Sequence, residues 1–319
     1  MKKIFINLSL FLRICFSFLL VGVLIYKVSL SVIIDTVTAY PLRIVFFAAC
    51  IHLLATGVSA LRWKILLPVF SYIDLLKFSF VGQFYAMVLP GQITGEIAKA
   101  YRVSRGSNEN AGKVTASIAV DKIIGLIGVM FVTILGLLFT DLPEKNTWIG
   151  SIVLLSLIFI TIFVFISNEY VHQKTQKLLQ KSEIRFFNLG KVFVFIKGVF
   201  EGFKQYSSNP KTLIVSLFLA ILFQILAVLI ILIFALGLDI HIPFQNYFWI
   251  FGIVSLAVML PVTVAGLGVR EGLFVYFLLQ FNVPPEQGLI LSLSVFSLQV
   301  LAACIGAFFE LITFYKNRF

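Results

Sequence analysis

The chain has 319 residues, of which 60% are hydrophobic and only 12% are charged, and its formal net charge is +11. Soluble domains are nearer half apolar and a quarter charged, so this composition excludes a soluble protein and indicates an integral membrane protein. The basic excess is the pattern expected of cytoplasmic loops, and the solvated basic domain that nucleic-acid binding would need is not seen.

Six apolar stretches are long enough to cross a membrane, which takes about 20 residues. They are 10–29, 43–61, 114–140, 148–167, 212–237 and 286–314. Two further apolar regions, 73–104 and 245–282, are each interrupted near the middle by Pro and Gly. The sequence therefore predicts an all-α polytopic membrane protein with about six full spans and two broken regions.

Lys and Arg are concentrated in alternate connections between these stretches. They gather at residues 2–3, 62–64, 99–113, 169–211 and 316–318, whereas the opposite connections, 35–43, 141–147 and 238–245, contain few. By the positive-inside rule the first set is cytoplasmic. We therefore expect a multi-pass protein of the cytoplasmic membrane with both termini inside the cell.

The first broken region has basic residues on both sides, so it starts and ends in the cytoplasm. Its first half, Asp74–Leu89, would span about 24 Å as a helix, which is short of a hydrocarbon core of about 30 Å. Its second half, Gly95–Arg102, is too polar to face lipid. A re-entrant hairpin explains both features, since protein or a water-filled cavity must cover irregular backbone at this depth.

The second broken region starts and ends on the opposite side, so it predicts a hairpin that enters from the other face; two complete spans are the alternative. Both breaks read Leu-Pro-x4-Gly, at 89–95 and 260–266. The predicted tip residues are Pro90, Gly91, Gly95, Pro261, Gly266 and Gly268. Paired interrupted segments entering from opposite faces are typical of the inverted repeats of transporters.

These elements predict one integral membrane domain over 1–319, with a first half 1–167, a cytoplasmic connector 168–211 and a second half 212–319. Within the connector, 186–206 has apolar residues at helical spacing with lysines elsewhere on the wheel. An amphipathic helix is expected there. The pattern does not decide between a position on the membrane surface and packing against the protein's own cytoplasmic face.

Charged side chains at membrane depth cost about 2.5–3.5 kcal/mol each on insertion scales, so they are candidates for function. Glu96, Lys99 and Arg102 are spaced three apart and share one face of the predicted helix. A half-helix N-terminus attracts an anion such as phosphate, and Arg102 offers a bidentate contact. The alternative is an ion network among the three side chains.

Asp121 and Lys122 lie one to two turns inside the third predicted span. We expect Asp121 to pair with Lys99, Lys122 or Arg270, either in a binding site or as a structural salt bridge.

The second hairpin carries Arg270, a further phosphate contact, next to Glu271. Adjacent residues point to different helix faces, so these two are expected to have different partners. The alternative is that polar pairs within the protein satisfy both and hold the hairpin against the bundle. Glu310, near the end of the last span, is interpreted as interfacial.

Three motifs resemble one family. They are Pro90 to Arg102 with its Gly-Glu and following basic residues, the pair Asp121-Lys122, and Pro261 followed by Ala265-Gly266-Leu267-Gly268-Val269-Arg270-Glu271. In order and spacing the chain resembles the lysylphosphatidylglycerol synthase transmembrane-region family of flippase-like proteins. It departs from the family pattern at Ala265, where glycine is usual, and at Lys122, where arginine is common.

The resemblance implies translocation of a charged lipid between leaflets, without the aminoacyl-tRNA-dependent domain of larger relatives, so no enzymatic activity is expected. The predicted substrate is a phospholipid or a polyprenyl-phosphate-linked molecule. Arg102 and Arg270 would hold one phosphate with the assistance of Lys99, while Glu96, Asp121 and Glu271 would balance charge or bind a cationic headgroup. The sequence suggests no cofactor and no metal site. The alternatives are an integral-membrane enzyme acting on lipid-linked sugar or phosphate, and a non-catalytic subunit working with glycan or envelope-assembly proteins.

Overall fold

The computed structural model describes residues 40–88, 92–105, 111–141, 146–152, 209–259, 263 and 266–316. All regular secondary structure in these ranges is helical, which confirms the all-α prediction for this part of the chain. Besides a short helical segment at 146–152, the helices are α3 (Leu42–Leu66), α4 (Tyr72–Val88), α5 (Gln92–Arg105), α6 (Ala111–Leu138), α10 (Pro210–Gly237), α11 (Phe244–Met259), α12 (Val269–Leu279) and α13 (Pro285–Lys316).

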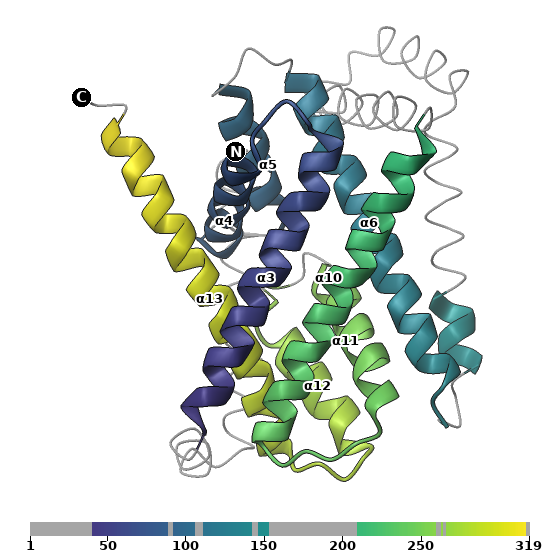
Figure 1. Ribbon diagram of the computed structural model, residues 1–319. Coiled ribbons are helices and arrows are strands. Elements are labelled where there is room, and N and C mark those ends of the chain that lie inside the picture. Colours follow the sequence, from purple (N-terminus) through teal and green to yellow (C-terminus); the bar gives the residue numbers. More distant parts are fainter. Residues whose placement is uncertain are drawn as a thin grey trace, which may run out of the picture.

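Four helices, α3, α6, α10 and α13, are long and apolar enough to cross a membrane. They run the length of the molecule in Figure 1, which confirms apolar helices of spanning length at four of the predicted spans, those at 43–61, 114–140, 212–237 and 286–314. The predicted span 10–29 lies outside the described residues. So do the span 148–167, apart from its helical first residues, and the amphipathic segment 186–206.

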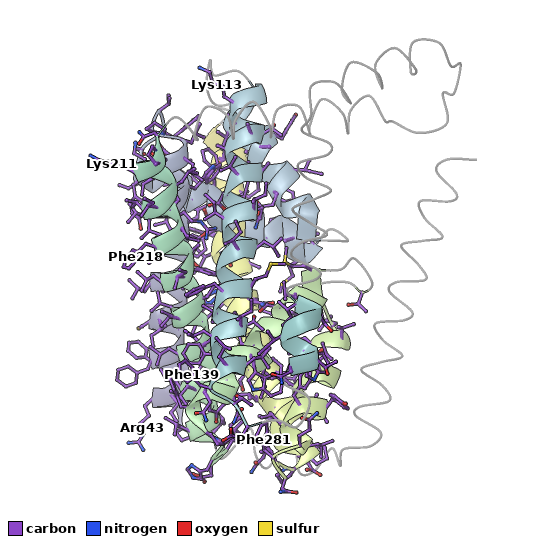
Figure 2. All side chains as sticks on the ribbon, turned by 90° about the vertical axis from the view of Figure 1, so that its right-hand side faces the viewer. Arg43, Lys113, Phe139, Lys211, Phe218 and Phe281 are labelled. Carbon is purple, nitrogen blue, oxygen red and sulfur yellow. The ribbon has the colours of Figure 1, made fainter. Side chains whose placement is uncertain are left out.

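The outer surface of these helices carries large apolar side chains. Phe46, Phe47 and Phe218 are each at least 60% exposed, and Phe218 points away from the bundle in Figure 2. A soluble protein rarely exposes so much contiguous apolar surface, because water solvates it poorly. This surface therefore faces lipid.

Each broken region forms a pair of short helices, α4 with α5 and α11 with α12. The longest of the four, α4, has 17 residues and spans about 26 Å. Figure 1 places the two pairs in opposite halves of the bundle, the arrangement that the two predicted hairpins require. Entry from a membrane face depends on where the lipid lies, so re-entrance stays a prediction. The tips Pro90, Gly91 and Pro261 lie outside the described residues.

The two ends of the bundle differ in the charged residues that they carry. Lys113 and Lys211, at the starts of α6 and α10, lie at one end in Figure 2. Arg43 lies at the other end, which also carries acidic residues. Asp239 follows the far end of α10, and Glu286 opens α13 close to Phe281 at that same end. The basic end is the one that the loop charges assign to the cytoplasm; that orientation itself remains a prediction.

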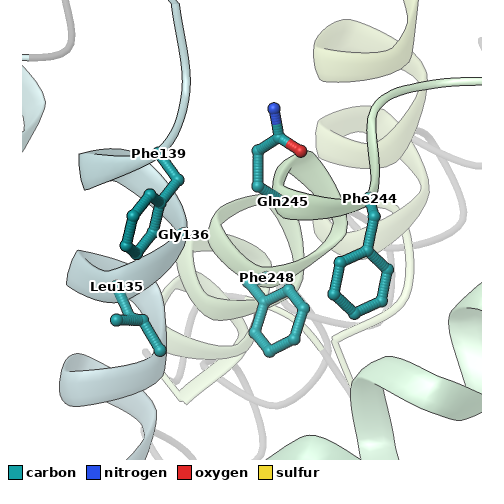
Figure 3. Close-up of a pocket in the computed structure, with 6 residues that line it drawn as sticks. All are labelled: Leu135, Gly136, Phe139, Phe244, Gln245 and Phe248. Carbon is teal, nitrogen blue, oxygen red and sulfur yellow. The ribbon is translucent and has the colours of Figure 1, made fainter.

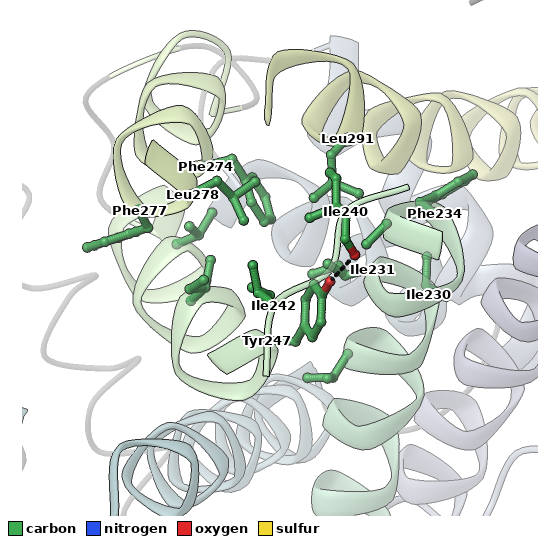
Figure 4. Packing of buried hydrophobic residues seen from close by; sticks show 14 of the residues in the cluster. Ile230, Ile231, Phe234, Ile240, Ile242, Tyr247, Phe274, Phe277, Leu278 and Leu291 are labelled. Carbon is green, nitrogen blue, oxygen red and sulfur yellow. Dashed lines mark hydrogen bonds between the residues drawn. The ribbon is translucent and has the colours of Figure 1, made fainter. Parts of the chain in front are cut away.

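The largest buried cluster packs α10, α11 and α12 against α13, as Figure 4 shows for Phe234, Phe274 and Leu291. Tyr247 lies inside it and donates a hydrogen bond of 3.1 Å to the Ile240 carbonyl oxygen, so its hydroxyl is satisfied. A glycine brings the neighbouring helix close: a methyl group at Gly252 would overlap the side chain of Thr133 on α6. Small residues at such contacts are characteristic of helix packing in membranes.

Candidate functional site

The charged side chains inside the described bundle form three groups. The five-charge group consists of Arg62, Glu96, Lys99, Asp121 and Lys122. The Arg102 group consists of Tyr85, Arg102 and Glu310. The Arg270 group consists of Arg270, Glu271, Ser292 and Gln299. Every charged residue that the sequence predicted for the site falls in one of these groups.

Arg62 and Asp121 form the most buried contact of the five-charge group. The guanidinium donates from Nε to Oδ1 at 2.6 Å and from Nη2 to Oδ2 at 3.0 Å, and the two residues are 5% and 4% exposed. The expected partners of Asp121, namely Lys99, Lys122 or Arg270, are thus corrected to Arg62. Arg62 follows the predicted second span 43–61, but α3 continues to Leu66 and carries this side chain into the bundle.

Two lysines share the carboxylate of Glu96. Lys99 lies 3.2 Å from Oε2 and Lys122 lies 2.7 Å from Oε1. Lys99 is buried, with its ammonium 4.5 Å from the centroid of the Trp63 ring and its methylene groups against Gly82. The side chain of Lys122 is 52% exposed, although it lies within the apolar stretch of α6. The expected contact between Glu96 and Lys99 is therefore present. Arg102 does not join them and instead pairs with Glu310 in the Arg102 group.

The charges of the five-charge group do not cancel. At neutral pH its three cations and two carboxylates leave one positive charge. The other two groups each pair one arginine with one carboxylate and are neutral. Among the three described groups, the five-charge group is thus the one with a net positive charge, which attracts an anion.

In the Arg102 group, Arg102 on α5 forms an ion pair with Glu310 on α13. Tyr85 on α4 donates its hydroxyl to the same carboxylate oxygen at 2.6 Å. The side chains of Arg102 and Glu310 are 27% and 16% exposed, so this contact is open to solvent or ligand in part. The interpretation of Glu310 as interfacial missed this role. The signal for it was a carboxylate well inside the apolar stretch of α13, more than 20 residues after Glu286.

The Arg270 group lies at the start of α12 and is the most deeply buried of the three. Arg270 and Glu271 are 3% and 0% exposed and pair directly, with Nη2 at 2.5 Å from Oε1. The other oxygen of Glu271 accepts the N–H of Gly268 at 2.5 Å. The prediction that the two neighbours have different partners is wrong, because Glu271 turns back to cap the helix and the long Arg270 side chain follows it.

The glycines of this segment allow that turn. Gly266 and Gly268 have φ angles of 75° and 86°, in the left-handed region that glycine adopts at little cost. A side chain at Gly266 would also contact Val258 on α11. These two predicted tip residues therefore bring α12 back against α11, with the Arg270 group at the start of the returning helix.

Helix α13 supplies the remaining partners of Arg270. Nε lies 3.2 Å from Ser292 Oγ, Nη1 lies 3.2 Å from Gln299 Oε1, and the guanidinium carbon is 4.6 Å from the centroid of the Phe296 ring. The guanidinium is thus satisfied within the protein. These contacts fit the alternative to phosphate binding given above, in which polar pairs within the protein hold the second hairpin against the bundle.

Arg102 and Arg270 contact positions that are far apart on α13. Gln299 and Glu310 are separated by eleven residues, which is about 16 Å along a helix. One phosphate group is much smaller than this separation. In this conformation the two arginines therefore form two distinct positions and not the single phosphate clamp that the sequence suggested.

An apolar groove of about 450 Å³ lies between the end of α6 and the start of α11. Figure 3 shows the residues that line it: Leu135, Gly136, Phe139, Phe244, Gln245 and Phe248. None of the six described lining residues is charged, and Phe139 lies at the end of the molecule away from Lys113 in Figure 2. The groove shares no residue with the three charged groups.

In the described part of the chain, no group of three or more His, Cys, Asp or Glu residues is arranged to hold a metal ion. The family model described as "Lysylphosphatidylglycerol synthase TM region" matches residues 10–306, which confirms the resemblance seen in the sequence. No curated protein and no solved structure matches the chain. The matched range includes the five-charge and Arg270 groups, whereas Glu310 lies just beyond it.

Proposed function

This chain belongs to the lysylphosphatidylglycerol synthase transmembrane-region family, and on that premise we propose that it moves a phosphate-bearing lipid, or the headgroup of a lipid-linked molecule, across the cytoplasmic membrane. Its membrane-spanning helices and its family make it a membrane protein that acts on lipids. Translocation of the lipid is the more specific activity that we propose. It requires a polar route for the headgroup while the acyl chains stay in lipid.

The observation that carries the proposal is the position of the charged groups. The five-charge and Arg102 groups include residues of α4 or α5, and the Arg270 group lies at the start of α12, in the pair of short helices in the opposite half of the bundle. Charged side chains inside membrane proteins commonly mark substrate pathways, because burying them is costly. Sites at two broken helix pairs in opposite halves are what alternating access uses.

The two arginines have different roles in this proposal. Arg102 is partly exposed, so a headgroup phosphate can displace the carboxylate of Glu310 from it. Arg270 is enclosed by its own partners and would bind a headgroup only after the second pair of helices shifts along α13. Lys99 would assist the first position, and Glu96, Asp121 and Glu271 would act as counter-ions to the basic residues.

The test is lipid movement in proteoliposomes. Vesicles containing a phospholipid with a fluorescent acyl chain are treated with a membrane-impermeant reducing agent, and the protein is expected to increase the fraction of label that becomes accessible. Arg102→Gln should slow movement by roughly tenfold or more, since charge-assisted hydrogen bonds contribute about 1.5–3 kcal/mol. Lys211→Gln, which makes the same charge change at an exposed position, should leave the rate unchanged.

Monodispersity in detergent shows that the variants fold. A wild-type rate equal to that of protein-free vesicles would contradict translocation. Mass spectrometry of the same lipids distinguishes the enzyme alternative, which predicts a change in lipid mass in place of a change in leaflet.

A further inference from the structure

The five-charge group has an electrostatic property that the proposed translocation does not by itself explain. Arg62, Lys99 and Lys122 exceed Glu96 and Asp121 by one positive charge. The two buried cations, Arg62 and Lys99, each lie against a carboxylate, whereas the side chain of Lys122 is 52% exposed, so the excess charge lies at the accessible side of the group. The group therefore has a place for one negative charge that the described residues do not supply.

A second observation points the same way. Arg62 is 5% exposed, and its Nη1 is a buried donor that has no hydrogen-bond partner among the residues that the structure describes. The guanidinium lies over Gly125, with Nη1 3.7 Å from the position that a Cβ atom would occupy. Buried charged donors are normally satisfied, because leaving one unpaired forfeits its solvation. An acceptor brought by a ligand would satisfy it.

Lys122 is the member of the five-charge group that a ligand can reach. Its side chain is half exposed, whereas Lys99 and Arg62 are buried. Lys122 lies nine residues along α6 from Lys113, or about 13 Å into the apolar stretch. It also interacts electrostatically with Asp121 and Arg62 as well as Glu96. An anion that reaches Lys122 therefore meets the field of the whole group.

We propose that the five-charge group binds the phosphodiester of a lipid that carries a single negative charge, with Lys122 as the contact residue and with Arg62 and Lys99 behind it. This deepens the proposed function, on which it rests, by naming the class of headgroup. One negative charge brings the group to neutrality. A zwitterionic headgroup leaves the excess in place, and a phosphomonoester or diphosphate brings more negative charge than the group balances.

Binding is measured on the purified full-length protein in detergent. The probes are dioctanoyl phosphatidylglycerol, a short-chain isoprenyl phosphodiester of a sugar, dioctanoyl phosphatidylcholine and dioctanoyl phosphatidic acid. At least one of the two singly charged phosphodiesters should bind about tenfold or more tightly than phosphatidylcholine. The tighter of the two identifies a glycerophospholipid or a polyprenyl-linked sugar as the source of the phosphodiester.

Two variants test the residues. Lys122→Gln should weaken binding of the preferred phosphodiester by on the order of tenfold, and the fold should survive because this side chain is half exposed. Lys211→Gln is the control for charge at the same end of the molecule and should bind as the wild type does. Glu96→Gln raises the net charge of the group to two and should shift the preference toward phosphatidic acid.

Equal binding of phosphatidylcholine and both phosphodiesters by the wild type would overturn the proposal. So would wild-type affinity in Lys122→Gln. Selective binding without lipid movement in vesicles would retain the site and reject translocation, whereas movement that Lys122→Gln leaves unchanged would retain translocation and reject the site.

Discussion

Arg62 and Asp121 join α3 to α6 through two parallel hydrogen bonds, 2.6 Å and 3.0 Å long, between side chains that are 59 residues apart in the sequence. Both residues are buried, so protein replaces water around the pair. Bidentate pairing of a guanidinium with a carboxylate fixes distance and orientation together. The pair therefore sets how α6, which also carries Lys122, lies against α3.

Removing one member of this pair should destabilise the protein more than removing both. Asp121→Leu leaves Arg62 charged and buried without its partner, a loss of about 3–5 kcal/mol. The double variant Arg62→Met, Asp121→Leu replaces the pair with apolar side chains and should recover much of that loss. Thermal unfolding in detergent measures both, and Asp141→Asn at an exposed position is the control. A double variant no more stable than Asp121→Leu would contradict a simple pairing role.

Arg270→Lys tests whether Arg270 is held by the protein. A lysine has no planar fork and cannot reach Glu271, Ser292 and Gln299 together. We expect a lower melting temperature, by an amount equivalent to about 1–3 kcal/mol for the buried polar groups left unpaired, accompanied by slower lipid movement. Arg43→Lys, at an exposed site, should change neither. Normal stability with impaired movement would instead indicate that Arg270 binds substrate directly.

Gly252→Ala should loosen the contact between α11 and α6. The added methyl group would overlap the side chain of Thr133, and overpacking of this kind costs about 1–3 kcal/mol. Gly272→Ala on α12 is the matched control, since no atom of another described segment lies within 4 Å of the added methyl group. Alanine there should be neutral or stabilise the helix by about 0.5–1 kcal/mol. Thermal unfolding of the two variants in the same detergent makes the comparison.

The orientation in the membrane is tested by cysteine labelling. Single cysteines at Lys113 and Asp239, in a chain without its native cysteines, report on the two ends of the bundle. The positive-inside rule predicts that position 113 is labelled from the cytoplasm and position 239 from outside. An impermeant maleimide applied to intact and to opened cells distinguishes them. Labelling of position 113 in intact cells would reverse the topology and, with it, the face that the first pair of helices enters.

The sequence alone determined the class of the protein, four of the membrane-spanning helices and both breaks. Each depends on information within one short window. A spanning segment must form its backbone hydrogen bonds internally and present apolar side chains to lipid. A run of about 20 apolar residues therefore predicts a helix wherever it occurs. Pro and Gly interrupt such a run for equally local reasons. Most of the charged residues in the three groups were visible because charges are rare in these runs, but Arg62 was assigned to a loop and Glu310 to the membrane interface.

Only the tertiary structure decided which charges meet. Asp121 pairs with Arg62, Arg102 with Glu310, and Arg270 with its own neighbour Glu271. These pairings depend on how far α3 extends, on how each helix is rotated and on where α13 crosses the two pairs of short helices. Such quantities are fixed by packing among small and large side chains of distant segments, and no local pattern of hydropathy or charge records them.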